Sequence, residues 1–168
     1  MSASTGRLAF ATGWLAVAAQ AVWAWSRWPD RVPMHFGVAG DVDRWGTATE
    51  FFVVWGIVLG MLALIFGALP LVIARLPVSA INLPNREYWL ADERRVATMS
   101  RVAGQLGWFG TGTLALMFAL LQLIDPVAMG GLDHMSARVF WSVFGVYGVF
   151  VAAFLVRMLS SYRLPRAS

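Results

Sequence analysis

The chain of 168 residues is rich in hydrophobic side chains and poor in charge. Hydrophobic residues make up 59% of the sequence and charged residues 13%, and the formal net charge is +4. A soluble domain of this length needs a far more charged surface, so the composition indicates an integral membrane protein. All thirteen basic residues are arginines that flank apolar stretches instead of forming one basic face. Nucleic acid is therefore not expected as a partner.

The absence of cysteine is a second compositional limit. With no cysteine in the chain, disulfides, thiolate chemistry and cysteine-ligated metals are excluded. The redox state of the compartment cannot be deduced from this sequence.

Four apolar stretches are long enough to cross the roughly 30 Å of bilayer hydrocarbon at about 1.5 Å per helical residue. They cover residues 8–25, 51–74, 102–124 and 139–156. A signal peptide is the competing interpretation of the first stretch, but its length, its aromatic far end and the lack of a small-residue cleavage site favour a span. Pro70 should kink or end the second. We expect an all-α integral membrane protein, with residues 1–168 forming one four-helix transmembrane domain in the lipid bilayer.

Arginine placement predicts the orientation of these spans. Nine arginines lie in the two tails and the loop between spans two and three, and four lie in the other two loops. The positive-inside rule then places both termini and the middle loop in the cytoplasm, and an ordered first loop outside. The expected location is the bacterial cytoplasmic (inner) membrane, as a multi-pass protein.

Small residues predict where helices approach closely. In span three a residue with a small side chain recurs every fourth position, and span two contains a GxxxG pair. The packing residues expected from these patterns are Gly56, Gly60, Gly107 and Thr111, with Ala103, Ala115 and Ala119 on the same stripe. These contacts fit packing within one chain or against another subunit, and the pattern leaves both open.

The loop from Trp28 to Gly46 gathers most of the rare residue types of the chain. Prolines fix backbone torsions, glycines permit positive φ, and aspartates bond nearby amides in turns, so the loop should form an ordered cap. In a structural role, His35 ties this loop to the helix ends; in a functional role, it binds a ligand. The residues expected to structure the loop or to bind the ligand are His35, Pro33, Phe36, Gly40, Asp43, Arg44 and Trp45.

A metal ion is a further possibility for the first loop. Imidazole and carboxylate groups suit zinc and similar ions, and the candidate ligands are His35, Asp41, Asp43 and His134. Their spacing matches no metal-binding motif, so no cofactor is assigned.

The middle loop carries a second group of candidate residues. Asn85 follows a proline and suits a helix N-cap, and the aromatic and arginine residues after it suit a short helix in the membrane interface. The plain interpretation is an elbow at the membrane surface; the alternative is a docking site for a cytoplasmic partner. The residues of that docking site would be Asn85, Arg86, Tyr88, Trp89, Arg94 and Arg95.

Both loops resemble segments of a known family. The string from Pro29 to Phe36, followed by Gly40 and the run from Asp43 to Gly46, resembles the "LPDRIPTHFNLAGEPDRWGSK" pattern of small bacterial membrane proteins of unknown function. That family includes the Sdp-type toxin immunity protein, and the string from Asn82 to Leu90 is similar to a second segment recurrent in it. The resemblance implies a relative that protects cells from a secreted toxic peptide and can hold a repressor at the membrane. The chain departs from the family in having four spans where the immunity protein is longer, and Thr47 where lysine is frequent.

These observations favour a non-enzymatic function. The apolar stretches contain no Asp or Glu, which disfavours proton-coupled transport, and no serine lies in a nucleophile-elbow context. We expect a sensor or immunity-like protein that acts through the outer His35 loop and the inner middle loop. The alternative is an accessory or structural subunit of a larger membrane complex, and a metal-dependent membrane enzyme is third. The expected partners are other membrane protein subunits or a cytoplasmic protein.

Overall fold

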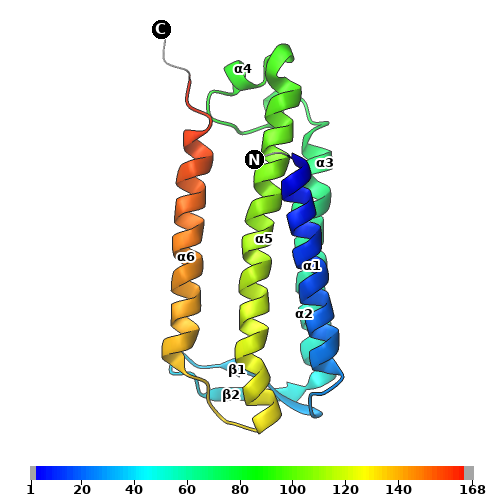
Figure 1. The fold of residues 1–168 in the computed structure, drawn as a ribbon, viewed down its shortest axis with the longest axis vertical. Helices are drawn as coiled ribbons and strands as arrows, with labels where there is room; N and C mark the ends of the chain where they lie inside the picture. Colours follow the sequence, from blue (N-terminus) through cyan, green and yellow to red (C-terminus); the bar gives the residue numbers. More distant parts are fainter. Residues whose placement is uncertain (1–2, 165–168) are drawn as a thin grey trace.

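The computed structural model describes residues 3–164 and contains four helices long and apolar enough to cross a membrane (Figure 1). They are α1 (Ala3–Trp25), the continuous helix formed by α2 (Ala48–Leu62), η1 (Ala63–Ala68) and α3 (Leu69–Ile73), then α5 (Asp92–Gly130) and α6 (Ala137–Ser160). The predicted four-helix membrane architecture is confirmed. The inside and outside faces remain a prediction, and Arg166, one of the arginines counted for it, lies outside the described residues.

The helices are longer than the apolar stretches. At about 1.5 Å per residue, the 39 residues of α5 extend roughly 58 Å, well beyond the thickness of the hydrocarbon core. Polar residues at both its ends therefore reach past the predicted span of 102–124. One end meets the first loop and the other meets the middle loop, which contains η2 (Val78–Ala80) and the short helix α4 (Arg86–Trp89).

Pro70 changes the second span as expected, but without ending it there. The segment η1 before Pro70 is a π-helix, and the amide of Leu69 bonds to the carbonyl of Leu64, five residues back. Proline has no N–H and its ring collides with the carbonyl four residues earlier, so the wider π turn accommodates it. The helix then continues to Ile73.

α1 lies along α5 at backbone contact distance. A Cβ atom built on Gly6 would lie 2.3 Å from the carbonyl oxygen of Gly104, and one on Gly107 would lie 2.5 Å from the backbone of Gly6. Only glycine permits this approach. Gly107, one of the packing residues expected from the small-residue pattern, makes this contact within the chain.

The rest of the small-residue pattern behaves differently. Ala115 and Ala119 line a groove between α5 and α6, not the α1 contact. A four-residue step advances a helix by about 400°, so the pattern drifts about 40° per repeat and leaves the α1 face. The prediction of one stripe on one face was wrong. A Cβ atom on Gly56 or Gly60 would meet no atom within 4 Å, so this pair faces away from the described part of the chain.

α6 stands apart from the other helices. It runs on the opposite side of α5 from α1 (Figure 1), and none of its described residues is buried. The contact with α5 is made by aromatic rings, with the ring of Phe150 lying against Gly112. The Thr113 and Tyr147 hydroxyls are 2.9 Å apart across this interface.

The first loop is an antiparallel hairpin of β1 (Arg31–Phe36) and β2 (Val42–Thr47). It crosses one end of the helices, behind the lower part of α5 in Figure 1. Val32 is fully buried and belongs to an apolar cluster that includes Trp28, Phe51 and Leu121. The side chains of Thr47 and Glu50 form a capping box that begins α2 directly after β2. We call this end of the molecule the hairpin end and the opposite one the middle-loop end.

Candidate functional site

The strand register of the hairpin is irregular next to His35. Pro33 pairs with Trp45, His35 with Arg44 and Phe36 with Val42, so each strand has one residue without a partner in this stretch. Bulges of this kind change the direction in which side chains point. Proline lacks an N–H group, so it is tolerated in an edge strand, where one side of the backbone has no partner. Pro33 lies in β1, and its side chain is nearly fully buried.

His35 and Asp43 form an exposed pair on this hairpin. Nδ1 of His35 and Oδ1 of Asp43 are 2.6 Å apart, and the side chains are 67% and 53% exposed. In the neutral imidazole this contact places the proton on Nδ1 and leaves Nε2 as an acceptor. No other hydrogen bond of the His35 ring occurs within residues 3–164. His35 therefore bonds within the hairpin and not to a helix end.

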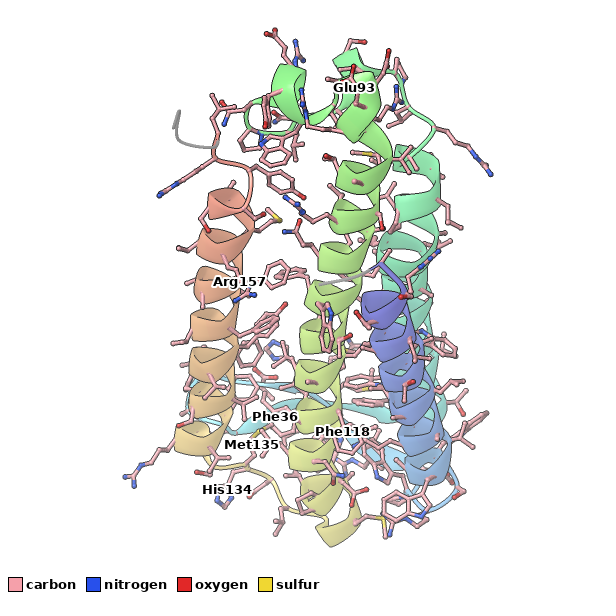
Figure 2. All side chains as sticks on the ribbon, turned by 45° about the horizontal axis from the view of Figure 1, so that its top comes forward. Phe36, Glu93, Phe118, His134, Met135 and Arg157 are labelled. Atoms are coloured by element: carbon pink, nitrogen blue, oxygen red, sulfur yellow. The ribbon has the colours of Figure 1, made fainter. Side chains whose placement is uncertain are left out.

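The turn of the hairpin is held by the segment that precedes α6. The amide of Val42 donates to the carbonyl of Asp133 at 2.7 Å, and the amide of Met135 donates to the carbonyl of Gly40 at 2.9 Å. Figure 2 shows His134 and Met135 at this end, beside the hairpin residue Phe36. Trp141 of α6 adds a third contact, from its indole Nε1 to the carbonyl of Val38 at 3.0 Å.

The glycine at position 40 is required by this arrangement. Its φ is +95°, and a Cβ atom there would lie 2.2 Å from the carbonyl oxygen of Met135. Other residues rarely adopt this backbone conformation, and none can approach Met135 so closely. The sequence prediction of a conformation-specific glycine fits the backbone of Gly40.

A second contact fixes the base of the hairpin to α5. The indole Nε1 of Trp28 donates to Oδ1 of Asp125 at 2.8 Å, and a guanidinium nitrogen of Arg27 lies 3.1 Å from the same oxygen. Because Trp28 is buried, its N–H needs this partner. Sequence reasoning missed Asp125, since it lies at the end of an apolar span and 97 residues from Trp28.

The remaining predicted loop residues divide between packing and exposure. Phe36 is partly buried, and Trp45 is partly buried beneath the guanidinium of Arg31, whose carbon lies 4.8 Å from the ring centre. Arg44 is exposed on β2. An exposed face of His35, Asp43 and Arg44 therefore lies on a hairpin that is anchored beneath; we call these three residues the polar face.

The four metal-ligand candidates do not form one cluster within residues 3–164, although Asp41 and His134 pair as an isolated antiparallel bridge. Besides the His35–Asp43 pair, His134 lies 3.5 Å from its neighbour Asp133. Within residues 3–164 no group of three or more His, Asp or Glu side chains is placed to hold a metal ion. Stable protein metal sites generally need at least three such ligands.

The middle-loop candidates contact the chain after α6. The side chains of Asn85 and Trp89 both donate to the carbonyl of Tyr162 at 2.9 Å. Asn85 occupies the N-cap position of α4, as predicted, but its φ is +53° and its side chain makes no capping bond. Arg94 and Arg95 also bond inward, to the carbonyls of Tyr88 and Leu76. Arg86 is exposed.

Tyr162 is the centre of this end. Its hydroxyl donates to Oε1 of Gln105 at 2.6 Å, and Gln105 donates to the hydroxyl of Ser161. Burial raises the pKa of Tyr162 to about 12, with the positive charge of Arg101 acting in the opposite direction. Sequence reasoning missed Tyr162 and Gln105, because nothing local marks a contact between residues 57 positions apart.

The geometry defines a protein with four helices long and apolar enough to cross a membrane, an anchored hairpin at one end of them and an ordered loop at the opposite end. Comparison with known families finds that residues 13–62 match a domain of unknown function, DUF1648. The match covers the second half of α1, the hairpin and all of α2. No curated protein and no solved structure matches the chain.

Proposed function

We propose that the protein is a non-enzymatic membrane sensor or immunity-like protein that binds a peptide or protein ligand on the polar face of the hairpin. The observation that carries the proposal is the combination of an anchored backbone with exposed side chains. Hydrogen bonds fix the hairpin to α5, α6 and the segment between them, while His35, Asp43 and Arg44 remain exposed. A preordered surface with mixed charge binds without the entropy cost of ordering a loop.

α5 provides the physical link to the opposite end. Asp125 near its end holds Trp28 beneath the hairpin, and Gln105 and Arg101 near its beginning bond to residues 161 and 162. A ligand that binds better to one tilt or position of α5 would shift the middle loop at the other end. The exposed Arg86 on α4 would then meet a cytoplasmic partner, in the predicted orientation.

Site-specific photo-crosslinking tests this proposal. A photoreactive amino acid replaces Arg44 on the polar face or Arg86 on α4, and Val146, an exposed apolar residue of α6, serves as the control. Irradiation of intact cells should give a discrete polypeptide adduct at Arg44 and none at Val146. If Arg44 gives no polypeptide adduct while the protein accumulates in the membrane, the proposal is contradicted.

A second candidate is an accessory subunit of a larger membrane complex. The observation in its favour is the open GxxxG pair of α2, because such pairs allow a neighbouring helix to approach closely. A photoreactive residue at Ile57, exposed between Gly56 and Gly60, probes this face. Adducts of fixed stoichiometry at Ile57, with none at Arg44, would favour the subunit.

A further inference from the structure

A crevice lined by three arginines opens at the middle-loop end, between α1, α3 and α5. It encloses about 440 Å³ and does not overlap the contacts of Tyr162. Its arginines are Arg7 in α1, Arg75 just after α3 and Arg95 in α5. We call this feature the arginine crevice. Its charged groups come from three segments far apart in the sequence, so the fold itself creates the positive site.

The positive charge of the crevice has no counterion in the described part of the chain. No Asp or Glu lines it, and none of its three arginines forms a salt bridge within residues 3–164. Arg7 and Arg95 each donate one hydrogen bond to a backbone carbonyl, of Ala3 and Leu76. A guanidinium has five N–H donors, so most of them remain for an acceptor with several oxygens.

Apart from Ser100, the other walls of the crevice are apolar. Pro70, Leu71 and Met99 contribute to them, together with the alanines at positions 3, 74 and 103. Val96 also lines the crevice and is 82% exposed. An amphipathic ligand has a charged group attached to an apolar part. The arginines can bind the charged group, and the open apolar wall beside them can contact the apolar part.

The position of the crevice at the ends of the helices indicates the chemical class of its ligand. Residue Arg7 lies near the beginning of α1 and Arg75 follows the end of α3, so both lie where membrane-spanning helices end. Lipid phosphates lie at that level, and basic pockets between helix ends suit anionic headgroups. The predicted orientation places this end at the cytoplasmic leaflet, whose surface is negatively charged.

We propose that the arginine crevice binds an anionic phospholipid, with its phosphate on Arg7, Arg75 and Arg95 and an acyl chain along Leu71 and Pro70. A second pair of arginines lines a smaller pocket of about 150 Å³: Arg157 of α6, labelled in Figure 2, and Arg101 of α5. There Arg101 already donates to the carbonyl of Ser161. The larger volume and third arginine favour the crevice between α1, α3 and α5.

Native mass spectrometry of the purified full chain tests the proposal. The probes are phosphatidylglycerol and phosphatidylcholine with the same acyl chains, and inorganic phosphate is the third arm. Phosphatidylglycerol should bind at least about tenfold more tightly than phosphatidylcholine, and millimolar phosphate should not displace it. Each arginine near the surface contributes about fivefold to anionic-lipid affinity. Arg75→Gln should therefore weaken phosphatidylglycerol binding about fivefold, and replacing all three arginines with Gln should remove the preference.

Arg163→Gln is the matched control, since Arg163 is exposed at the same end and does not line the crevice. It should keep the affinity of the unmodified chain. Arg75 is exposed and its side chain makes no hydrogen bond within residues 3–164, so Arg75→Gln also serves if the triple variant fails to fold. Equal affinity for the two lipids, an unchanged affinity in Arg75→Gln, or displacement by inorganic phosphate would each overturn the proposal.

Discussion

The indole of Trp28 and the carboxylate of Asp125 join the base of the hairpin to α5 across 97 positions of sequence, with Nε1 and Oδ1 2.8 Å apart. Trp28 is also in ring contact with Phe51 and Phe52 of α2. One tryptophan thus joins the end of α1, the start of α2 and the far end of α5. This relationship explains why a hairpin of only two strands, which is marginal alone, is ordered here.

Asp125→Ala should therefore loosen the hairpin. The buried Trp28 N–H loses its acceptor, which costs about 1–3 kcal/mol of unfolding free energy. Asp125→Asn should cost less, because the amide oxygen can still accept the bond. Thermal unfolding of the purified protein measures both changes, with Asp133→Ala as the control because that side chain is 93% exposed. Equal stability of Asp125→Ala and the control would show that the contact contributes nothing.

Gly40→Ala should destabilise the same end for a different reason. The strained backbone costs about 1–3 kcal/mol, and the new Cβ atom also displaces the carbonyl of Met135. Gly131→Ala is a matched control, because Gly131 also has a positive φ, of +60°, but nothing lies within 4 Å of its added Cβ. In the control, only the strained backbone conformation lowers the stability. Gly40→Ala should therefore have the lower melting temperature. If the two variants lose the same amount of stability, the backbone at Met135 moves away from the new Cβ atom at little cost in free energy.

Hydropathy predicted the four spans because a bilayer leaves few alternatives to a helix of apolar residues. It did not predict where α5 ends, since its outer turns carry polar residues and are stabilised by contacts such as those of Asp125 and Arg95. The ends of a helix that leaves the hydrocarbon are set by tertiary contacts. The limits 102–124 mark the apolar part of α5, not the ends of the helix.

The hairpin could be predicted as an ordered segment but not as a pair of strands. Pro33 lies in the middle of β1 and argues against a strand in sequence terms, and the bulges beside His35 break the alternation of polar and apolar residues. The pairing with the Asp133 and Met135 backbone has no sequence signal at all. For the same reason, the candidates Asn85 and Trp89 were recognised as unusual while their contact with Tyr162 was not.

His35 substitutions test whether its role is to hold the loop or to bind a ligand. Its contact with Asp43 is exposed, and exposed ion pairs contribute about 0–1 kcal/mol. We expect His35→Asn, His35→Gln and His35→Leu all to fold, with melting temperatures close to that of the unmodified chain. If the polar face binds a ligand, all three should reduce the Arg44 crosslink together. A loss of 1–3 kcal/mol in His35→Leu alone would instead support a structural role.

Cysteine labelling tests the orientation, and the natural absence of cysteine makes every introduced thiol unique. The exposed positions Asp41 and Asp133 report on the hairpin end, and Glu87 reports on the middle-loop end. In intact cells a membrane-impermeant reagent should label the first two and not Glu87, while permeabilised cells should label all three. The reverse pattern in intact cells would invert the predicted topology.

The buried hydroxyl of Tyr162 makes stability depend on alkaline pH. The pKa is about 12 in the folded protein and about 10 in an unfolded chain, so folding favours the protonated form. Its contribution is complete below pH 10 and is lost as the pH rises from 10 to 12. Two pKa units correspond to about 2–3 kcal/mol of unfolding free energy.

Tyr162→Phe isolates that contribution. The variant should be less stable at pH 7 by about 1–3 kcal/mol, because Oε1 of Gln105 loses its donor. Between pH 10 and 12 its stability should fall less steeply than that of the unmodified chain, so the difference between the two should shrink. Tyr88→Phe, at a partly buried residue on the same side of the molecule, should retain the full alkaline decline. A constant difference between Tyr162→Phe and the unmodified chain across this range would contradict a buried, protonated Tyr162.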